Sequence, residues 1–96
     1  PAGEAAPMGL GLLASTDHVT MGILRLQPGV AKSYSETRDH DMILLATDNT
    51  VVVERRDTWE LLTKNSSFYI CRGVPYSVRN ISSAPAEVCF VLVAPC

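Results

Sequence analysis

Apolar and polar residues alternate along most of this chain in short runs that turn residues interrupt. The runs predict strands over residues 20–26, 42–46, 50–54, 58–62, 67–71, 76–80 and 86–94. Pairs such as Pro28-Gly29 and Asp48-Asn49 separate the runs and are typical of turns. No segment keeps an apolar period of about 3.6 residues for long enough to predict a helix. Strands that recur at intervals of roughly eight to twelve residues predict an all-β barrel or sandwich.

The first fourteen residues differ from the rest of the chain. They contain two prolines and three glycines, at Pro1, Gly3, Pro7, Gly9 and Gly11. A segment that is interrupted so often is expected to form neither a helix nor a long strand. Leu10, Leu12 and Leu13 nevertheless give it apolar side chains with which to dock. We expect residues 1–14 to form a flexible or docking arm and residues 15–96 to form a single domain.

The charge balance excludes some classes of partner. Eight basic and ten acidic residues give a formal net charge of −2, whereas nucleic-acid-binding domains usually carry a basic stripe. The adjacent pair Arg55-Arg56 is flanked by Glu54 and Asp57, as at a solvated hairpin tip. No apolar run approaches the ~20 residues of a membrane span. We expect a soluble domain that binds neither nucleic acid nor membrane, and its low charged fraction of 19% indicates a surface partly covered by a partner.

Two segments have the spacing of the two cupin motifs. The first runs from Gly29 over five residues to Ser35, over one residue to Thr37 and over three residues to Asp41. The second runs from Gly73 over two residues to Tyr76 and over three residues to Asn80. The spacing predicts an all-β cupin fold, which is a double-stranded β-helix or jelly-roll barrel.

The metal-binding residues of these motifs are absent. In cupins, two histidines and a glutamate of the first motif and a histidine of the second converge on a metal inside the barrel. Their places are taken here by Ser35, Thr37, Asp41 and Tyr76. Hydroxyls with one carboxylate are a poor replacement for imidazoles, which are the usual ligands of a catalytic divalent metal. We therefore expect these four residues to line the barrel as a degenerate metal site, with no metal, no cofactor and no catalytic residue.

A longer stretch resembles one branch of the cupins. Residues 71–82, Cys-Arg-Gly-Val-Pro-Tyr-Ser-Val-Arg-Asn-Ile-Ser, are similar to the C-terminal cupin of centromere protein C, the Mif2-type kinetochore proteins. The resemblance extends over about residues 20–94. Cys71 stands where this family has proline, and Asp48 and Asn65 stand where it has turn glycines. Aspartate and asparagine tolerate left-handed turn geometry, so these two departures are mild.

The resemblance implies a non-enzymatic homodimerisation module of a centromere or kinetochore scaffold protein in the nucleus. It also implies a surface that docks a centromeric-histone chaperone or another kinetochore protein. Members of the family recognise the centromeric nucleosome mainly through a short basic-aromatic motif upstream of the cupin. Nothing in residues 1–20 resembles that motif. Contact with DNA is therefore expected of the full-length protein and not of this domain.

A second class of function stays open at this point. The barrel cavity around Tyr76, Ser35 and Thr37 could bind or modify a small, sugar-like molecule without a metal. A metal-free isomerase would need a histidine and an acid beside the tyrosine, and neither His18 nor His40 falls at a barrel-lining motif position. The molar mass in solution, together with a metal assay, would distinguish the two classes.

The motif also predicts which surface a partner covers. If Asp41 points into the barrel, then Ile43 and Leu45 do so too, and the residues between them point outward. In the last strand Val88 and its alternate neighbours form the bulkier, inward set. Strands that are apolar on both faces are covered on both faces. We therefore expect a second copy or a partner protein to cover Met42, Leu44, Ala46, Cys89, Val91 and Val93.

Overall fold

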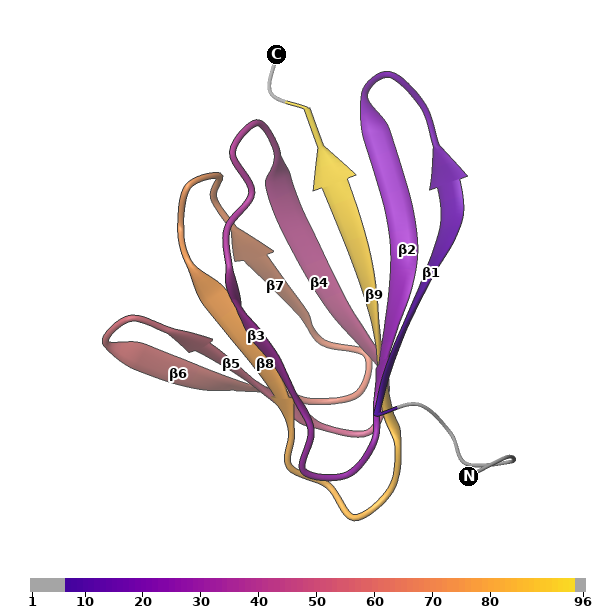
Figure 1. Ribbon diagram of the computed structural model, residues 1–96, viewed down its shortest axis with the longest axis vertical. Helices are drawn as coiled ribbons and strands as arrows, with labels where there is room; N and C mark the ends of the chain where they lie inside the picture. Colours follow the sequence, from indigo (N-terminus) through magenta and orange to yellow (C-terminus); the bar gives the residue numbers. More distant parts are fainter. Residues whose placement is uncertain (1–6, 95–96) are drawn as a thin grey trace.

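The computed structural model describes residues 7–94, and these residues form strands joined by turns (Figure 1). The strands are β1 (Met8–Ser15), β2 (Val19–Leu26), β3 (Ala31–Ser35), β4 (Asp41–Asp48), β5 (Val51–Arg55), β6 (Thr58–Leu62), β7 (Ser67–Ile70), β8 (Tyr76–Asn80) and β9 (Ala86–Val93). The described range contains no helix of the length and apolar character that crossing a membrane requires. The predicted all-β class is confirmed.

The strands form two antiparallel sheets that face each other. One sheet has five strands in the order β1-β2-β9-β4-β7, and the other has four in the order β3-β8-β5-β6. Figure 1 shows the two groups on opposite sides of the molecule, spreading apart from the end where the loops gather. Every neighbouring pair is antiparallel, and most of these neighbours are distant in the sequence. The inner faces of both sheets therefore build one shared core.

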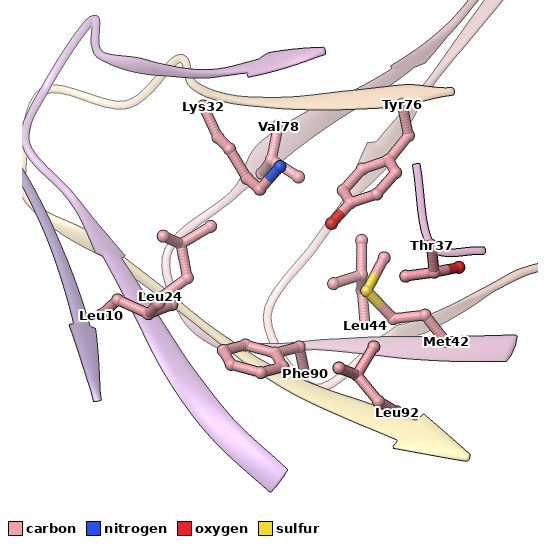
Figure 2. A pocket seen from close by; sticks show the side chains of 10 residues that line it. All are labelled: Leu10, Leu24, Lys32, Thr37, Met42, Leu44, Tyr76, Val78, Phe90 and Leu92. Carbon is pink, nitrogen blue, oxygen red and sulfur yellow. The ribbon is translucent and has the colours of Figure 1, made fainter. Parts of the chain in front are cut away.

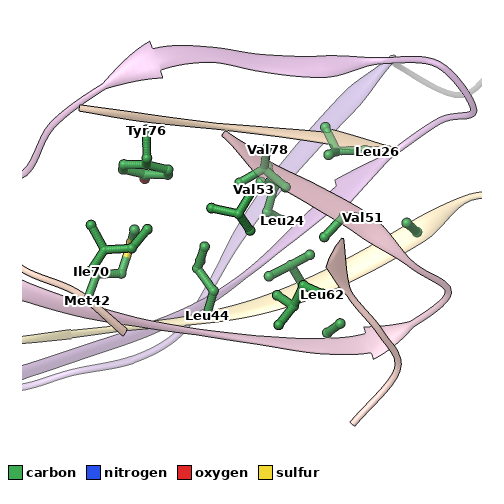
Figure 3. Packing of buried hydrophobic residues seen from close by; sticks show 13 residues of the cluster. Leu24, Leu26, Met42, Leu44, Val51, Val53, Leu62, Ile70, Tyr76 and Val78 are labelled. Atoms are coloured by element: carbon green, nitrogen blue, oxygen red, sulfur yellow. The ribbon is translucent and has the colours of Figure 1, made fainter. Parts of the chain in front are cut away.

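The core consists of alternate residues of the inner strands, and Figure 3 shows side chains of the two sheets pointing toward one another. Leu26, Val51, Val53, Val78 and Val88 are all completely buried. Each lies two residues from another buried position on its strand, because side chains along a strand alternate between the two faces.

Asn80 is a completely buried polar residue at the end of β8. Its Nδ2 donates to the carbonyl oxygens of Leu26 and Ala84, both at 2.9 Å. Its Oδ1 accepts from the backbone nitrogen of Ser82 at 2.8 Å and from the Ser82 hydroxyl at 2.6 Å. The asparagine of the second motif thus ties the end of β2 to the turn that leads into β9.

Two turns use asparagine in a left-handed conformation. Asn65 has φ 69°, at a place where the resemblance led us to expect glycine geometry. In the turn after β4 the left-handed residue is Asn49, with φ 63°, and not Asp48. The Asn49 side chain also donates to the Pro85 carbonyl at 2.6 Å. Asparagine tolerates this geometry because its short polar side chain can bond locally to backbone groups.

The expected arm is in part a strand, since residues 8–15 form β1 and pair with β2 along their length. The expectation that glycines would prevent a long strand there was wrong. Gly9 and Gly11 both lie on the outer face, so Met8, Leu10 and Leu12 alternate with them on the inner face. Residues 1–6 of the expected arm lie outside the described residues.

Candidate functional site

The side chains of β4 face the opposite way from the prediction. Met42, Leu44 and Ala46 are 2%, 2% and 0% exposed, and they pack inside the core. They therefore cannot belong to the outer surface that was expected to bind a partner. Ile43 and Leu45, at 38% and 36% exposed, point outward in their place.

Asp41 is the reason for this reversal. Its Oδ1 accepts a hydrogen bond from the Arg72 backbone nitrogen at 3.0 Å, and the Arg72 Nε lies 3.9 Å away. Hydrogen bonds from the Tyr69 hydroxyl and from the Arg72 amide lower the pKa of this carboxyl. These partners hold Asp41 on the outer face, so it does not line the barrel. The first inward residue of β4 is Met42, one residue later.

The prediction for β9 agrees with the structure. Val88 is completely buried, and Phe90 and Leu92 pack against the core. Cys89, Val91 and Val93 alternate with them and are half-buried. Cys89 lies opposite Leu45, and Val91 lies opposite Ile43, both of which are outward residues of β4.

A cavity of about 190 Å³ lies between the two sheets. Both sheets contribute to its wall, and Figure 2 shows the side chains converging on it. The lining residues are Leu10, Leu24, Lys32, Thr37, Met42, Leu44, Tyr76, Val78, Phe90 and Leu92. Most of them are aliphatic or aromatic, so the cavity is apolar with a few polar groups on one side.

Three of the four degenerate metal-site positions gather around this cavity. Tyr76 is 6% exposed and lines it, as the sequence predicted, and Thr37 lines it as well. Ser35 lies opposite Tyr76 in the pairing of β3 with β8. Burial raises the pKa of the Tyr76 hydroxyl, although a hydrogen bond with Ser35 lowers it in part. Thr37 Oγ1 donates to the His40 carbonyl at 2.6 Å, which fixes the loop before β4.

Sequence reasoning missed Lys32, which extends from β3 into the cavity. Its Nζ lies 4.6 Å from the centre of the Tyr76 ring, contacts the Ser35 hydroxyl and donates to the Ser33 carbonyl at 3.4 Å. Burial lowers the pKa of this lysine. Lys32 lies opposite Val78 and Ser35 opposite Tyr76, so β3 has one extra residue between two inward positions. Such a β-bulge breaks the period of two, and strict alternation from Ser35 would have placed Lys32 outside.

The residues present do not fit a catalytic divalent metal. A hydroxyl, a phenol, a thioether and an ammonium group face the cavity, and the ammonium would repel a cation. Across residues 7–94, no three His, Cys, Asp or Glu side chains are grouped so that they could hold a metal ion.

The outer face of the five-stranded sheet carries two apolar rows, one across four strands and the other across three. One row contains Met21, Val91, Ile43 and Tyr69, and the other contains Ile23, Cys89 and Leu45, in direct cross-strand register. We call these residues, together with Val93, the outer apolar face. Tyr69 is 55% exposed and the remaining members are partly exposed.

Polar groups border the outer apolar face at both ends. At one end Arg25 pairs with Glu87 at 3.0 Å, and the Thr47 hydroxyl donates to the same carboxylate at 3.0 Å. The Arg25 and Thr47 hydrogen bonds lower the pKa of Glu87. Asp41 and Arg72 lie at the other end. An apolar centre with a polar rim is the usual anatomy of a protein–protein interface.

Comparison with known proteins identifies the fold. No protein-family model and no curated protein matches the sequence. Solved structures do match. The protein TT1209 from Thermus thermophilus has a TM-score of 0.84 and 24% identity, over 91% of this chain and 83% of the other. The Cnp3 cupin domain of Schizosaccharomyces pombe has a TM-score of 0.87 and 16% identity, over 95% and 67%.

A third similar structure is the cupin domain of an XRE family transcriptional regulator from Enterobacter cloacae. It has a TM-score of 0.85 and 18% identity, over 95% of this chain and 100% of the other. At these identities the similarity is one of fold. The spacing of the two motifs predicted the same fold from the sequence, and the chain therefore adopts the cupin fold.

Proposed function

We propose that this domain is a non-enzymatic homodimerisation module, in which two copies pack through the outer apolar face. The observation that carries the proposal is the pair of apolar rows on that face. Large exposed apolar patches with polar rims mark interaction sites on small soluble domains. The outer side of the four-stranded sheet is also apolar in places, but the ion pair of Glu54 with Arg79 at 3.5 Å crosses it. The outer apolar face has no such interruption along its two rows.

A second copy of the chain is a suitable occupant of this face. Each end of the face carries one acid and one base, so two copies related by a two-fold axis can meet without opposing like charges. The face spans three strands of eight residues and β7 with four. At about 4.8 Å between strands and about 3.3 Å per residue, these strands cover ~450 Å². Two copies would bury ~900 Å², which is in the range of weak, transient interfaces. We therefore expect a reversible dimer of modest affinity.

The biological setting is part of the same proposal. The resemblance of residues 71–82 to centromere protein C supports a role in a centromere or kinetochore scaffold, and the fold shared with the Cnp3 cupin domain agrees with it. The domain would act in the nucleus through protein contacts rather than by direct nucleic-acid binding. A centromeric-histone chaperone or another kinetochore protein would then be a second partner. Trp59, which is 65% exposed on β6, offers an aromatic anchor for it.

The cavity gives little support to a sugar-modifying enzyme. Neither histidine in the described range, His18 or His40, lines it. The raised pKa of Tyr76 keeps that hydroxyl protonated at neutral pH, so it lacks the character of a base. A sugar would also leave many of its hydroxyls without partners against the aliphatic wall, which is costly.

Sedimentation analysis of three variants tests the dimer. The wild-type domain should approach twice 10.4 kDa as its concentration rises, and Ile43→Glu should remain a folded monomer of 10.4 kDa. Glutamate at this position would have to be buried without a partner, which disfavours association. Val91→Glu, on the neighbouring strand, should behave in the same way.

Leu61→Glu is the matched control, because Leu61 is an exposed apolar residue of the other sheet, at 54%. It should leave the dimer unchanged. If Ile43→Glu and Val91→Glu stay dimeric while Leu61→Glu dissociates, the interface lies on the four-stranded sheet. If the wild type is a monomer at about 200 µM, dimerisation by this domain is refuted, since affinities weaker than this correspond to less than ~5 kcal/mol.

A further inference from the structure

The cavity between the sheets carries a positive charge on one wall and is apolar elsewhere. Lys32 extends into the cavity beside Tyr76, and Figure 2 shows the Tyr76 hydroxyl directed into the same space. The facing walls are formed by Leu24, Leu44 and Phe90. This arrangement places an ammonium group and a phenol at one end and aliphatic and aromatic carbon at the other.

The charge of Lys32 has no acidic partner among residues 7–94. The ion pairs of this range involve Arg25, Arg55, Arg72 and Arg79. Lys32 contacts only neutral groups there, which are the Ser33 carbonyl, the Ser35 hydroxyl and the Tyr76 ring. Partial burial of a cation without a counter-charge is costly, and the lowered pKa of Lys32 reflects that cost. An anion bound in the cavity would supply the missing counter-charge and remove that cost.

The side of the cavity that β1 borders is apolar. Leu10 and Leu12 of β1 lie on the inner side of the sheet, opposite Leu24 and Gly22, yet both are 69% exposed. Leu10 also contributes to the cavity wall. Inward-facing leucines that remain open to solvent mark a surface that a bound apolar group would cover.

The shape of the apolar wall depends on Gly22. A Cβ atom at this position would lie 2.6 Å from the Gly11 carbonyl oxygen and 2.8 Å from Cε1 of Phe90. The tip of the Phe90 ring therefore packs directly against the backbone of β2 at Gly22. Any side chain at residue 22 would push the ring toward the cavity.

We propose that this cavity binds a small amphipathic carboxylate. The carboxylate would accept hydrogen bonds from Lys32 Nζ and from the Tyr76 hydroxyl, and the apolar body would lie against Leu24, Leu44 and Phe90. An apolar cavity of about 150 Å³ holds benzene, and the cavity here has about 190 Å³. The ligand is therefore an aromatic or branched carboxylate of roughly the size of benzoate, with about six to ten non-hydrogen atoms.

The chemistry of the cavity favours a carboxylate over neutral, cationic and highly hydroxylated ligands. A neutral analogue loses the charge-assisted hydrogen bond, which is about twice as strong as a neutral one. A cation is repelled by Lys32. A highly hydroxylated ligand finds too few partners on the aliphatic wall. The carboxylate with a compact apolar body is the one class that uses both ends of the cavity.

Titration followed by nuclear magnetic resonance tests the proposal with benzoate as the probe and benzamide as its neutral analogue. Benzoate should shift the methyl signals of Leu24 and Leu44 and should bind at least about tenfold more tightly than benzamide. Lys32→Met keeps the apolar stem and removes the charge, so it should weaken benzoate binding by about tenfold or more and leave benzamide unchanged. Lys64→Met, which removes an exposed lysine from a turn, is the matched control and should have no effect.

Two further variants keep the outcomes distinct. Lys32→Arg retains the charge and should retain most of the preference for benzoate, even if Lys32→Met proves poorly folded. Ile43→Glu lies outside the cavity and should bind benzoate normally, so failure of the dimer does not affect this test. Equal binding of benzoate and benzamide, unchanged binding by Lys32→Met, or no binding of benzoate at about 10 mM would each overturn the proposal, since 10 mM corresponds to less than ~3 kcal/mol.

Discussion

Replacing Asn80 with alanine should destabilise the domain severely, although the side chain takes part in no proposed contact with a partner. The substitution removes four hydrogen bonds at 2.6–2.9 Å. The carbonyl of Leu26 would remain buried without a donor, which costs about 1–3 kcal/mol, and each of the other three bonds contributes about 0.5–1.5 kcal/mol. The Ser82 groups can recover part of this loss by turning to water or to Ala84.

The net loss is therefore about 3 kcal/mol. Domains of this size have free energies of unfolding of about 5–15 kcal/mol, so the change is a large fraction of the total. It corresponds to a decrease in melting temperature of roughly 12–24 °C, since 1 kcal/mol shifts the melting temperature of such a domain by about 4–8 °C.

Urea denaturation of Asn80→Ala, Ser82→Ala and the double variant measures this loss. Ser82→Ala removes only the hydroxyl contacts and should cost about 1 kcal/mol. The double variant should be less destabilised than the sum of the two, because both residues share one hydrogen-bond network. The reasoning is refuted if Asn80→Ala costs no more than Ser82→Ala, since the hydrogen bond to the buried carbonyl of Leu26 would then contribute nothing to the free energy of unfolding.

Two other substitutions test the local account. Gly22→Ala should overpack the core, which costs about 1–3 kcal/mol, so it should lower the melting temperature measured by calorimetry and weaken benzoate binding in the titration. Gly9→Ala is the control and should change neither quantity, because no atom lies within 4 Å of the added carbon. Asp41 has a pKa below its ordinary value of 3.8, so its contribution to stability is present above pH 3.8 and is lost as the pH falls through the lower folded value. In acid unfolding curves, Tyr69→Phe should reduce this loss because it removes the main cause of the shift, and an unchanged acid midpoint would contradict the assignment.

The sequence by itself determined the positions of most strands and the fold. Predicted strands at 58–62 and 76–80 coincide with β6 and β8, and five others agree with observed strands to within two residues at each end. These segments combine apolar residues with clear turn signals, so local information is sufficient. The motif spacing predicted the cupin fold. Gly29 and Gly73 of these motifs take the left-handed conformation that the turns require, with φ 78° in both. Asn80 is the last residue of the second motif, and in the structure it is completely buried with its side chain fully hydrogen-bonded.

The sequence did not decide which face of β4 is the inner one. Residues 42–46 are all apolar, so alternation gives two equally good phases, and the assumed inward direction of Asp41 selected the wrong one. The correct phase depends on Tyr69 and Arg72, which only the pairing of β4 with β7 brings to the carboxylate. The same residues therefore moved from the expected interface into the core.

The tertiary structure also decided the site. Lys32 faces the cavity because a bulge in β3 shifts its register against β8, and β1 exists as a strand because β2 supplies its hydrogen-bonding partners. Both features rest on pairing between strands rather than on local preference. A period of two in the sequence predicts that side chains alternate, whereas the partner strands determine which side is the interior and where the alternation is interrupted.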